Sequence, residues 1–126
     1  MKIKTGTDII EIERVKKAIE ETDEKFCERV YTPNEIEYCE SKKAQKYQHY
    51  AARFAAKEAV FKALSETLTN KYEIEWRDIE IQNEDNGRPY VKLKEKFAEL
   101  IESIDISISH CKEYAVANVI LIERED

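Results

Sequence analysis

The sequence predicts an α+β fold in one domain over residues 1–126, with a mostly antiparallel sheet packed on a long helix. Three observations lead to this prediction. A length of 126 residues is about that of one ordinary domain and predicts a single hydrophobic core. Helix patterns gather in the first half of the chain and strand patterns in the second, whereas a parallel βαβ sheet needs the two to alternate. An Asn86-Gly87 pair between two strand patterns predicts a hairpin, which is an antiparallel connection.

Local patterns give the elements of the first half in order. Residues 2–10 predict a strand because isoleucines and β-branched threonines recur there, and residues 12–22 predict a helix. Thr32-Pro33-Asn34-Glu35 marks the start of a second helix: threonine is the cap, proline takes the first helical position and glutamate follows three residues after the cap. We expect that helix to end near Ser41. Residues 44–68, rich in Ala, Lys, Glu and Leu, predict the longest helix.

The second half of the chain predicts strands with one short helix between them. Residues 73–82 alternate enough for a strand, and residues 89–93 form its partner across the Asn86-Gly87 turn. Residues 94–102 predict a short amphipathic helix. Two further strands follow, at 104–111 and 114–123, joined by a tight connection.

The composition excludes several kinds of site. Gly6 and Gly87 are the only glycines, so the chain contains neither a Rossmann fingerprint nor a P-loop, both of which need clustered glycines around phosphate. Any phosphate chemistry must then use side chains or a metal ion. A net charge of -6 argues against non-specific nucleic-acid binding, which depends on lysine and arginine.

The remaining composition predicts a soluble, cytoplasmic protein. No apolar run approaches the roughly 20 residues of a membrane helix, and the N-terminus lacks the apolar stretch of a secretion signal. The three cysteines, Cys27, Cys39 and Cys111, are odd in number and fit no zinc module, so we expect reduced thiols.

Three polar residues stand where the local pattern expects apolar ones. On a helical wheel, Glu58 falls between Phe54 and Phe61 on the apolar face of the long helix. In the first strand, Asp8 shares a face with Gly6 and other inward positions. In the strand at 104–111, His110 continues the face of three alternating isoleucines. Breaks of this kind tend to occur at functional or strained sites.

Each of these residues also has a purely structural interpretation. Glu58 is about as consistent with a salt bridge, for which Lys62 lies one helical turn away, as with a ligand. Asp8 is consistent with a cap on the following helix, and His110 with a satisfied histidine at a strand end. One shared pocket accounts for all three more economically than three separate explanations.

A pocket with two carboxylates and no cage of histidines suits Mg²⁺, which keeps several waters and binds substrate phosphate oxygens as well. Cations on the same helix, Arg53, Lys57 and Lys62, are available for further phosphate charge. His110 would bind a phosphate or act in proton transfer. The residues therefore predict a phosphate-bearing substrate whose developing charge is neutralised by metal and cations. Mn²⁺ is an equal alternative to Mg²⁺ on these ligands.

Five ordered motifs resemble the holo-acyl-carrier-protein synthase family of small bacterial phosphopantetheinyl transferases, over nearly the whole chain. The motifs are Gly6-Thr7-Asp8-Ile9-Ile10-Glu11-Ile12; Phe26, Arg29, Thr32, Glu35 and Cys39; Ala52-Arg53-Phe54-Ala55-Ala56-Lys57-Glu58-Ala59-Val60-Phe61-Lys62-Ala63-Leu64; Gly87-Arg88-Pro89; and Ser107-Ile108-Ser109-His110 followed by Ala115 and Ala117. One departure is visible. The family usually has a glycine-containing loop after its signature helix, whereas residues 65–70 here contain none.

The resemblance implies transfer of the 4'-phosphopantetheine arm of coenzyme A to a serine of apo-acyl carrier protein, with adenosine 3',5'-bisphosphate leaving. A stand-alone chain of this size favours fatty acid biosynthesis as the role by resemblance, with polyketide synthesis as the alternative. It implies that Asp8 and Glu58 bind Mg²⁺, and that Lys62, His110 and Arg53 lie near coenzyme A and its phosphates. It further implies a homotrimer with active sites at subunit interfaces.

The carrier protein is acidic in this family, and this chain is itself negatively charged. Binding must then use a local basic surface. Arg14, Lys16 and Lys17 on the helix after Asp8 supply one, and the resemblance assigns the contact to Arg14. An ordinary solvated helix face is about equally consistent with these three residues without the resemblance.

Two other functions remain open at this point. A metal-dependent nuclease also combines Asp, Glu and Lys around Mg²⁺, but its pattern usually lies on a strand, whereas Glu58 and Lys62 have helical spacing. A non-catalytic module that binds a partner through the basic helix would explain Arg14, but not the polar residues on three apolar faces.

Overall fold

The computed structural model describes residues 1–68 and 73–125. The fold is α+β, with antiparallel sheets and one long helix, as the sequence predicts. The elements in chain order are β1 (Ile3–Glu11), α1 (Ile12–Glu21), α2 (Lys25–Val30), α3 (Pro33–Glu40), a 3-10 helix (Lys43–Gln45), α4 (Lys46–Leu64), a second 3-10 helix (Trp76–Asp78), β2 (Ile79–Asn83), β3 (Pro89–Leu93), α5 (Glu95–Ala98), β4 (Ile101–His110) and β5 (Tyr114–Glu123).

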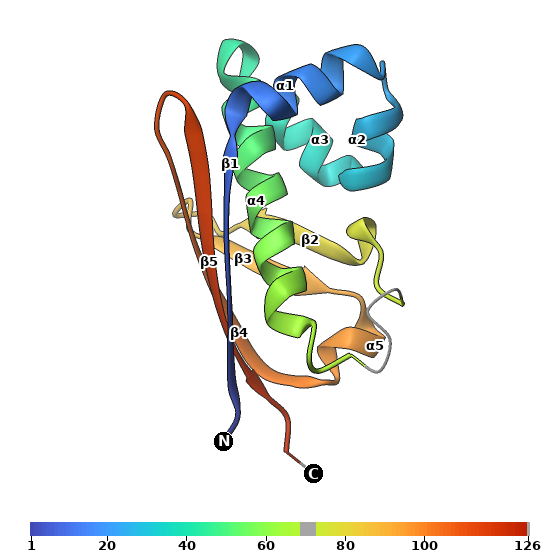
Figure 1. Ribbon diagram of the computed structural model, residues 1–126, viewed down its shortest axis with the longest axis vertical. Coiled ribbons are helices and arrows are strands. Elements are labelled where there is room, and N and C mark those ends of the chain that lie inside the picture. Colours follow the sequence, from blue (N-terminus) through green and yellow to red (C-terminus); the bar gives the residue numbers. More distant parts are fainter. Residues whose placement is uncertain (69–72, 126) are drawn as a thin grey trace.

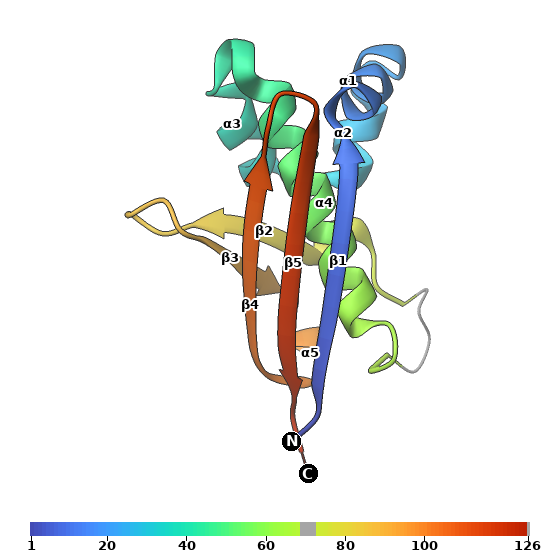
Figure 2. The ribbon, with the colours of Figure 1, turned by 60° about the vertical axis from the view of Figure 1, so that its left-hand side comes forward.

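Helix α4 packs along one face of a three-stranded antiparallel sheet with the strand order β1-β5-β4 (Figure 1). The β2–β3 hairpin forms a second sheet, which crosses behind the three strands in Figure 2. Helices α1, α2 and α3 gather around one end of α4, and α5 lies near the other end, where both chain termini also lie (Figure 1). Within the described part of the chain, every helix is too short or too polar to span a bilayer.

The inward face of the sheet and nearly the whole circumference of α4 are buried. Gly6 on β1 pairs with Val119 on β5, which pairs with Ile106 on β4, so these three positions face α4 together. Alanines cover much of α4 because the helix is enclosed on most sides and large side chains would not fit. The buried residues form two clusters along α4 that share the partly buried Ile10 and Ile108, where the sequence predicted a single core.

The opposite face of the three-stranded sheet is open among the described residues, and no helix lies in front of it in Figure 2. Several large apolar side chains point outward from it. The exposed fractions are 52% for Ile3, 64% for Ile9, 43% for Tyr114 and 48% for Ile120. An apolar sheet face of this kind is typical of a surface that another protein covers.

Some boundaries differ from the prediction for local reasons. Helix α4 ends at Leu64 rather than at residue 68, because the Ser65 hydroxyl donates to the carbonyl of Lys62 and competes with the helical hydrogen bonds. Strand β2 begins only at Ile79. The residues before it form a 3-10 helix, in which Glu75 and Asp78 make a reciprocal capping box.

The largest difference lies between the hairpin and the last two strands. The helix predicted at 94–102 covers only Glu95–Ala98, and β4 already begins at Ile101 with an irregularity in its pairing to β5. Helix α2, six residues long, was not predicted. It has no side-chain cap at its own N-cap residue, so the sequence carries little sign of its start.

Candidate active site

Strand β1 approaches α4 closely because Gly6 has no side chain. A Cβ built on Gly6 would lie 1.9 Å from the carbonyl oxygen of Ala59 and 2.9 Å from the backbone nitrogen of Ala63. No L-residue with a side chain fits that space without displacing the helix. Asp8, two residues further on the same face of β1, is thereby held against α4, as the strand pattern predicts.

Asp8 and Lys62 connect the strand to the helix by an ion pair. The Lys62 Nζ lies 3.0 Å from Asp8 Oδ1 and also donates to the carbonyl oxygen of Thr7 at 3.0 Å. The Asp8 side chain is 16% exposed and the Lys62 side chain 50%. The partner of Lys62 is therefore Asp8, whereas the sequence suggested Glu58.

Glu58 lies one turn before Lys62 on α4 and is half-buried. Burial raises the pKa of its carboxyl group, the negative charge of Asp8 raises it further, and Lys62 lowers it in part. The negative charge of Asp8 is therefore part of the electrostatic environment of Glu58. Asp8, Glu58 and Lys62 thus form one polar site on the β1 side of α4, as the sequence predicted for the two acids.

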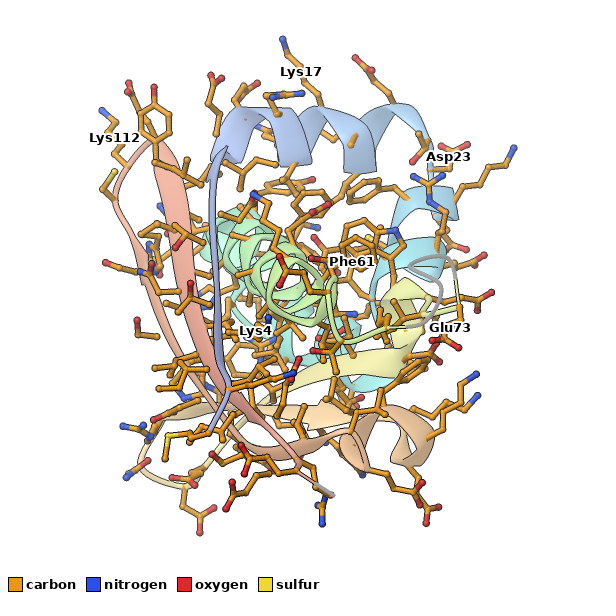
Figure 3. The ribbon with its side chains drawn as sticks, turned by 60° about the horizontal axis from the view of Figure 1, so that its bottom comes forward. Lys4, Lys17, Asp23, Phe61, Glu73 and Lys112 are labelled. Atoms are coloured by element: carbon orange, nitrogen blue, oxygen red, sulfur yellow. The ribbon has the colours of Figure 1, made fainter. Side chains whose placement is uncertain are left out.

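A cavity of about 160 Å³ opens beside Glu58, and apolar side chains form most of its lining. The lining residues are Lys57, Glu58, Phe61, Ile74, Glu75, Trp76 and Ile79. Trp76 stacks on Phe54 with ring centroids 5.1 Å apart, which fixes one wall. Figure 3 looks approximately along α4 and shows Phe61 beside its axis.

The donor set of this site matches the cation predicted from the sequence. Among the described residues, no group of three or more His, Cys, Asp and Glu side chains comes together as a complete metal cage. Asp8 and Glu58 supply two carboxylates, which is the share that Mg²⁺ takes from a protein when water and substrate phosphates complete its shell. The mutual repulsion of the two carboxylates also favours a divalent cation between them.

His110 lies apart from these two acids within one chain. It stands at the end of β4, and β5 separates β4 from β1. Two strand spacings correspond to roughly 10 Å. The single pocket that the sequence predicted for Asp8, Glu58 and His110 is therefore not formed inside one chain, because a sequence pattern gives the face of each strand but not the order of strands in the sheet.

Arg53 faces the β4 side of the molecule as well. Its guanidinium carbon lies 3.9 Å from the centre of the Tyr38 ring, and its Nη2 donates to Asn83 Oδ1 at 2.6 Å. The side chain is only 4% exposed, and its Nε has no hydrogen-bond partner among the described residues. Arg53 and Lys62, both predicted for the phosphates, thus lie on different sides of α4.

The sequence pattern did not reveal the contact made by His49 and misjudged the role of Lys57. The ring of His49, on α4 one turn before Arg53, packs edge-to-face with the ring of His110, with centroids 5.8 Å apart. The chain has only two histidines, and their separation in sequence gave no sign that they meet. Lys57, noted only as a candidate phosphate cation, is fully buried.

Lys57 is the centre of a buried polar network instead. Its Nζ lies 2.5 Å from Glu35 Oε1 and donates to the carbonyl oxygens of Val30 and Trp76. Burial lowers the pKa of Lys57, while Glu35 opposes that shift. Glu35 also accepts from the backbone nitrogens of Thr32 and Ile81. The network joins α3, α4 and β2 directly behind Glu58, so Lys57 is not free to bind phosphate.

The basic residues of α1 lie at the end of the molecule away from α5 (Figure 1). Arg14 and Lys17 are exposed, and Lys17 points away from the body of the protein in Figure 3. Lys16 is half-buried, with its ammonium 5.6 Å from the centre of the Tyr47 ring. Of the three predicted cations, Arg14 and Lys17 are thus the more accessible to a partner.

Comparison with known proteins gives consistent matches over nearly the whole chain. The family model of the 4'-phosphopantetheinyl transferase superfamily matches residues 4–119. A holo-[acyl-carrier-protein] synthase of Ruminiclostridium cellulolyticum is 50% identical over 126 residues, which cover 96% of this chain and 92% of that protein. The corresponding synthase of Geobacter sulfurreducens is 42% identical over 122 residues, with coverages of 93% and 94%.

Solved structures of similar proteins agree with these sequence matches. A holo-(acyl-carrier-protein) synthase from Bacillus anthracis in complex with CoA (3',5'-ADP) is 36% identical with a TM-score of 0.79, covering 97% of this chain and 96% of that one. The Helicobacter pylori holo-[acyl-carrier-protein] synthase in complex with coenzyme A is 31% identical with a TM-score of 0.80, with coverages of 95% and 99%.

Proposed function

Because the chain belongs to the holo-[acyl-carrier-protein] synthase family of the 4'-phosphopantetheinyl transferase superfamily, we propose that it transfers the 4'-phosphopantetheine group of coenzyme A to a serine of apo-acyl carrier protein in fatty acid biosynthesis. The serine oxygen forms a bond to the phosphorus that carries the pantetheine arm. The bond from that phosphorus to the bridging oxygen of the pyrophosphate breaks, the serine proton is released, and adenosine 3',5'-bisphosphate leaves. The cytoplasmic location predicted from the sequence stays a prediction.

One observation carries this proposal: Asp8 on β1 pairs with Lys62 and contributes to the electrostatics of Glu58 on α4, although Asp8 is far from both in the sequence. The repulsion between two acids beside a lysine lowers the stability of the folded protein, so a structural role alone does not explain why they lie together. They suit a site that receives a divalent cation together with phosphate oxygens. Asp8 and Glu58 would hold Mg²⁺, which when bound supplies a Lewis acid that polarises the pyrophosphate.

Basic side chains of the protein would neutralise the remaining negative charge of the substrate phosphates. Lys62 pairs with Asp8 in this structure, and its half-exposed ammonium would turn to a phosphate oxygen when substrate enters. Positioning and charge neutralisation make up most of the catalysis of phosphoryl transfer. The nucleophile is a serine of the carrier protein, so the chain needs no activated serine of its own. The base that receives the serine proton is left open.

The arrangement of the sheet supports a trimer with shared active sites. Asp8 lies on β1 and His110 on β4, at opposite edges of the three-stranded sheet. If copies are arranged in a closed ring, the β4 edge of one copy lies beside the β1 edge of the next, so Arg53 and His110 of one copy complete the site of its neighbour. The apolar outer face of the sheet, with Ile9 64% exposed, gives such an assembly its contact surface.

The carrier protein would bind next to this site through α1. This helix follows directly on β1, the strand that carries Asp8, so Arg14 lies close in sequence to one of the two candidate metal ligands. An acidic partner would be attracted to Arg14 and Lys17, both of which are exposed.

Mass spectrometry tests the reaction class. Apo-acyl carrier protein is incubated with the chain, coenzyme A and Mg²⁺, and a mass gain of one phosphopantetheine arm is expected. A parallel sample with EDTA in place of Mg²⁺ should show no gain. An unchanged carrier mass in the complete mixture would overturn the proposal.

The same experiment separates the other two functions. Cleavage of added DNA in the presence of Mg²⁺ would favour a nuclease. Binding of a partner without any affinity for coenzyme A or Mg²⁺ would favour a non-catalytic module. Family membership makes the transferase the better supported of the three.

A further inference from the structure

The only two histidines of the chain lie ring against ring at the β4 edge of the molecule. His49 lies in the first turn of α4 and is half-buried, whereas His110 ends β4 and is exposed. The His49 ring lies in an edge-to-face arrangement with the rings of His110 and Tyr38, with centroids 5.8 Å and 5.6 Å apart. Figure 2 shows the end of β4 beside α3 and the start of α4, the three elements that carry these rings.

Positive charge gathers around His49 without a neutralising carboxylate. Arg53 and Lys42 both lie over the Tyr38 ring, at 3.9 Å and 4.7 Å from its centre. Neither forms an ion pair with a described residue. Glu40 of α3 is engaged by the Tyr50 hydroxyl at 2.7 Å and by Lys46 at 3.3 Å.

The pKa of His49 is lowered in this environment. Burial lowers its pKa, and the charges of Lys42, His110 and Arg53 lower it further. Its place in the first turn of α4, at the positive end of the helix dipole, acts in the same direction. The imidazolium form of His49 is thus less favoured in the free protein than that of an ordinary histidine.

We propose that His49 is a positioning residue of the coenzyme A phosphate subsite, which holds the His110 ring in place and becomes positively charged when a phosphate dianion enters between His110 and Arg53. The proposal rests on the assignment of Arg53 and His110 to the coenzyme A phosphates made above. The unpartnered, buried Nε of Arg53 is consistent with a subsite that is incomplete before ligand binds.

Uptake of a proton by His49 is expected because its protonation and the binding of the phosphate dianion favour each other. A dianion next to His49 offsets the repulsion from Lys42, His110 and Arg53, and therefore favours the imidazolium. Binding of the phosphate then takes up a proton, so affinity rises as the pH falls. The contact with His110 makes a second contribution, which depends on ring shape and not on charge.

Two substitutions separate these contributions. His49→Phe keeps an aromatic ring against His110 and Tyr38 but cannot be protonated. His49→Ala removes both the ring and the charge. The ratio of each variant's dissociation constant to that of the parent cancels the titration of the phosphate itself, because the same ligand is used throughout. Adenosine 3',5'-bisphosphate is the ligand, in isothermal titration at about pH 8.5 and about pH 6.

The expected ratio for His49→Phe is about one at the higher pH, where the parent imidazole is neutral, and rises towards tenfold at the lower pH. The ratio for His49→Ala should exceed one at both pH values. A ratio for His49→Phe that does not change with pH would overturn the proposal. So would equal losses for the two variants at the higher pH, because ring shape would then make no contribution.

Nuclear magnetic resonance supplies a readout other than affinity. The two imidazoles can be assigned by comparing the spectra of the parent and His49→Phe, and the pKa of His49 should rise when adenosine 3',5'-bisphosphate is added. An unchanged pKa in the saturated complex would contradict the proposal. Failure of the transferase function itself would look different, because the parent would then bind no nucleotide and modify no carrier protein.

Discussion

Gly6 on β1 lies against Ala59 on α4 so closely that a Cβ on the glycine would be 1.9 Å from the alanine carbonyl oxygen. The contact joins a strand and a helix that lie far apart in the sequence. It sets the distance between Asp8 on the strand and Glu58 on the helix, which neighbours Ala59 directly. A packing constraint and the candidate metal pair thus depend on the same few residues.

Gly6→Ala should therefore affect both stability and activity. The added methyl group must push β1 away from α4, at a cost of about 1–3 kcal/mol for overpacking, and the displacement separates Asp8 from Glu58. Urea denaturation and the carrier-modification assay measure the two effects.

Gly87→Ala is the matched control, because its Cβ meets nothing within 4 Å and only the positive φ of 91° is strained. It should lose stability but keep its activity per folded molecule. Full activity of folded Gly6→Ala would contradict this account.

Glu58→Gln should abolish most turnover while the fold persists. The amide keeps the shape of the side chain but removes the negative charge that attracts the cation, so we expect a loss of about a hundredfold or more. Initial rates of carrier modification at saturating coenzyme A measure it. Glu84→Gln, an equivalent change at an exposed position of the hairpin, serves as control. A Glu58→Gln rate within a few-fold of the parent would make Glu58 a structural residue.

The same substitution should raise stability at neutral pH when no metal is present. Burial and Asp8 raise the folded-state pKa of Glu58 above its ordinary value of 4.5. A raised pKa contributes stability that is fully present below the unfolded value and is lost as the pH rises through the folded value. At roughly pH 7.5 the parent therefore has to fold with a disfavoured carboxylate, whereas the neutral amide of the Glu58→Gln variant carries no charge.

Thermal unfolding in EDTA measures this effect. The midpoint for Glu58→Gln should exceed that of the parent at roughly pH 7.5, and the two should converge at about pH 4. Excess Mg²⁺ should raise the midpoint of the parent and leave that of the variant nearly unchanged. A variant less stable than the parent at neutral pH in EDTA would show that the Glu58 carboxylate is favourably paired.

The secondary structure was largely predictable because its signals are local. The capping box of Thr32 and Glu35 is formed as predicted, and β3 and β5 have the predicted bounds. The face assignment of Asp8 also holds, because alternation in a strand is fixed by backbone geometry. Glu58 does lie with Phe54 and Phe61, but their side of α4 is the partly exposed one and not a buried apolar face. Residues 69 and 70 of the predicted glycine-free loop lie outside the described residues.

The parts that failed depend on contacts between distant segments. The separation of His110 from Asp8 follows from the strand order, in which β5 lies between β1 and β4. The burial of Lys57 requires Glu35, Val30 and Trp76 to come together from three other segments. No pattern around Lys57 distinguishes it from an exposed helical lysine, except that alanines surround it and leave room for neighbouring elements.

Lys57→Met should be strongly destabilising for that reason. It leaves the Glu35 carboxylate buried without its cation, which costs about 3–5 kcal/mol for a pair of this kind. It also removes the ammonium that donates to the carbonyl oxygen of Val30, whereas the carbonyl oxygen of Trp76 keeps the backbone N–H of Ile79. Urea denaturation of Lys57→Met, Glu35→Gln and the double variant measures the coupling between the two residues. The double variant should lose less than the sum of the single losses. Additive losses would mean that the two charges do not stabilise each other.

Arg14→Glu should weaken binding of apo-acyl carrier protein while sparing coenzyme A. The charge reversal places a negative charge on exposed α1, where an acidic partner would approach, so we expect a loss in affinity of about tenfold or more. Titration calorimetry with each substrate separates the two effects.

Lys96→Glu on α5 makes the same change in net charge at the other end of the molecule (Figure 1) and should leave both affinities unchanged. Because exposed charges are screened over about 8 Å at physiological salt, added salt should weaken carrier binding by the parent more than by Arg14→Glu. Equal loss of both substrates in Arg14→Glu, or an equal effect of Lys96→Glu, would place the carrier surface elsewhere.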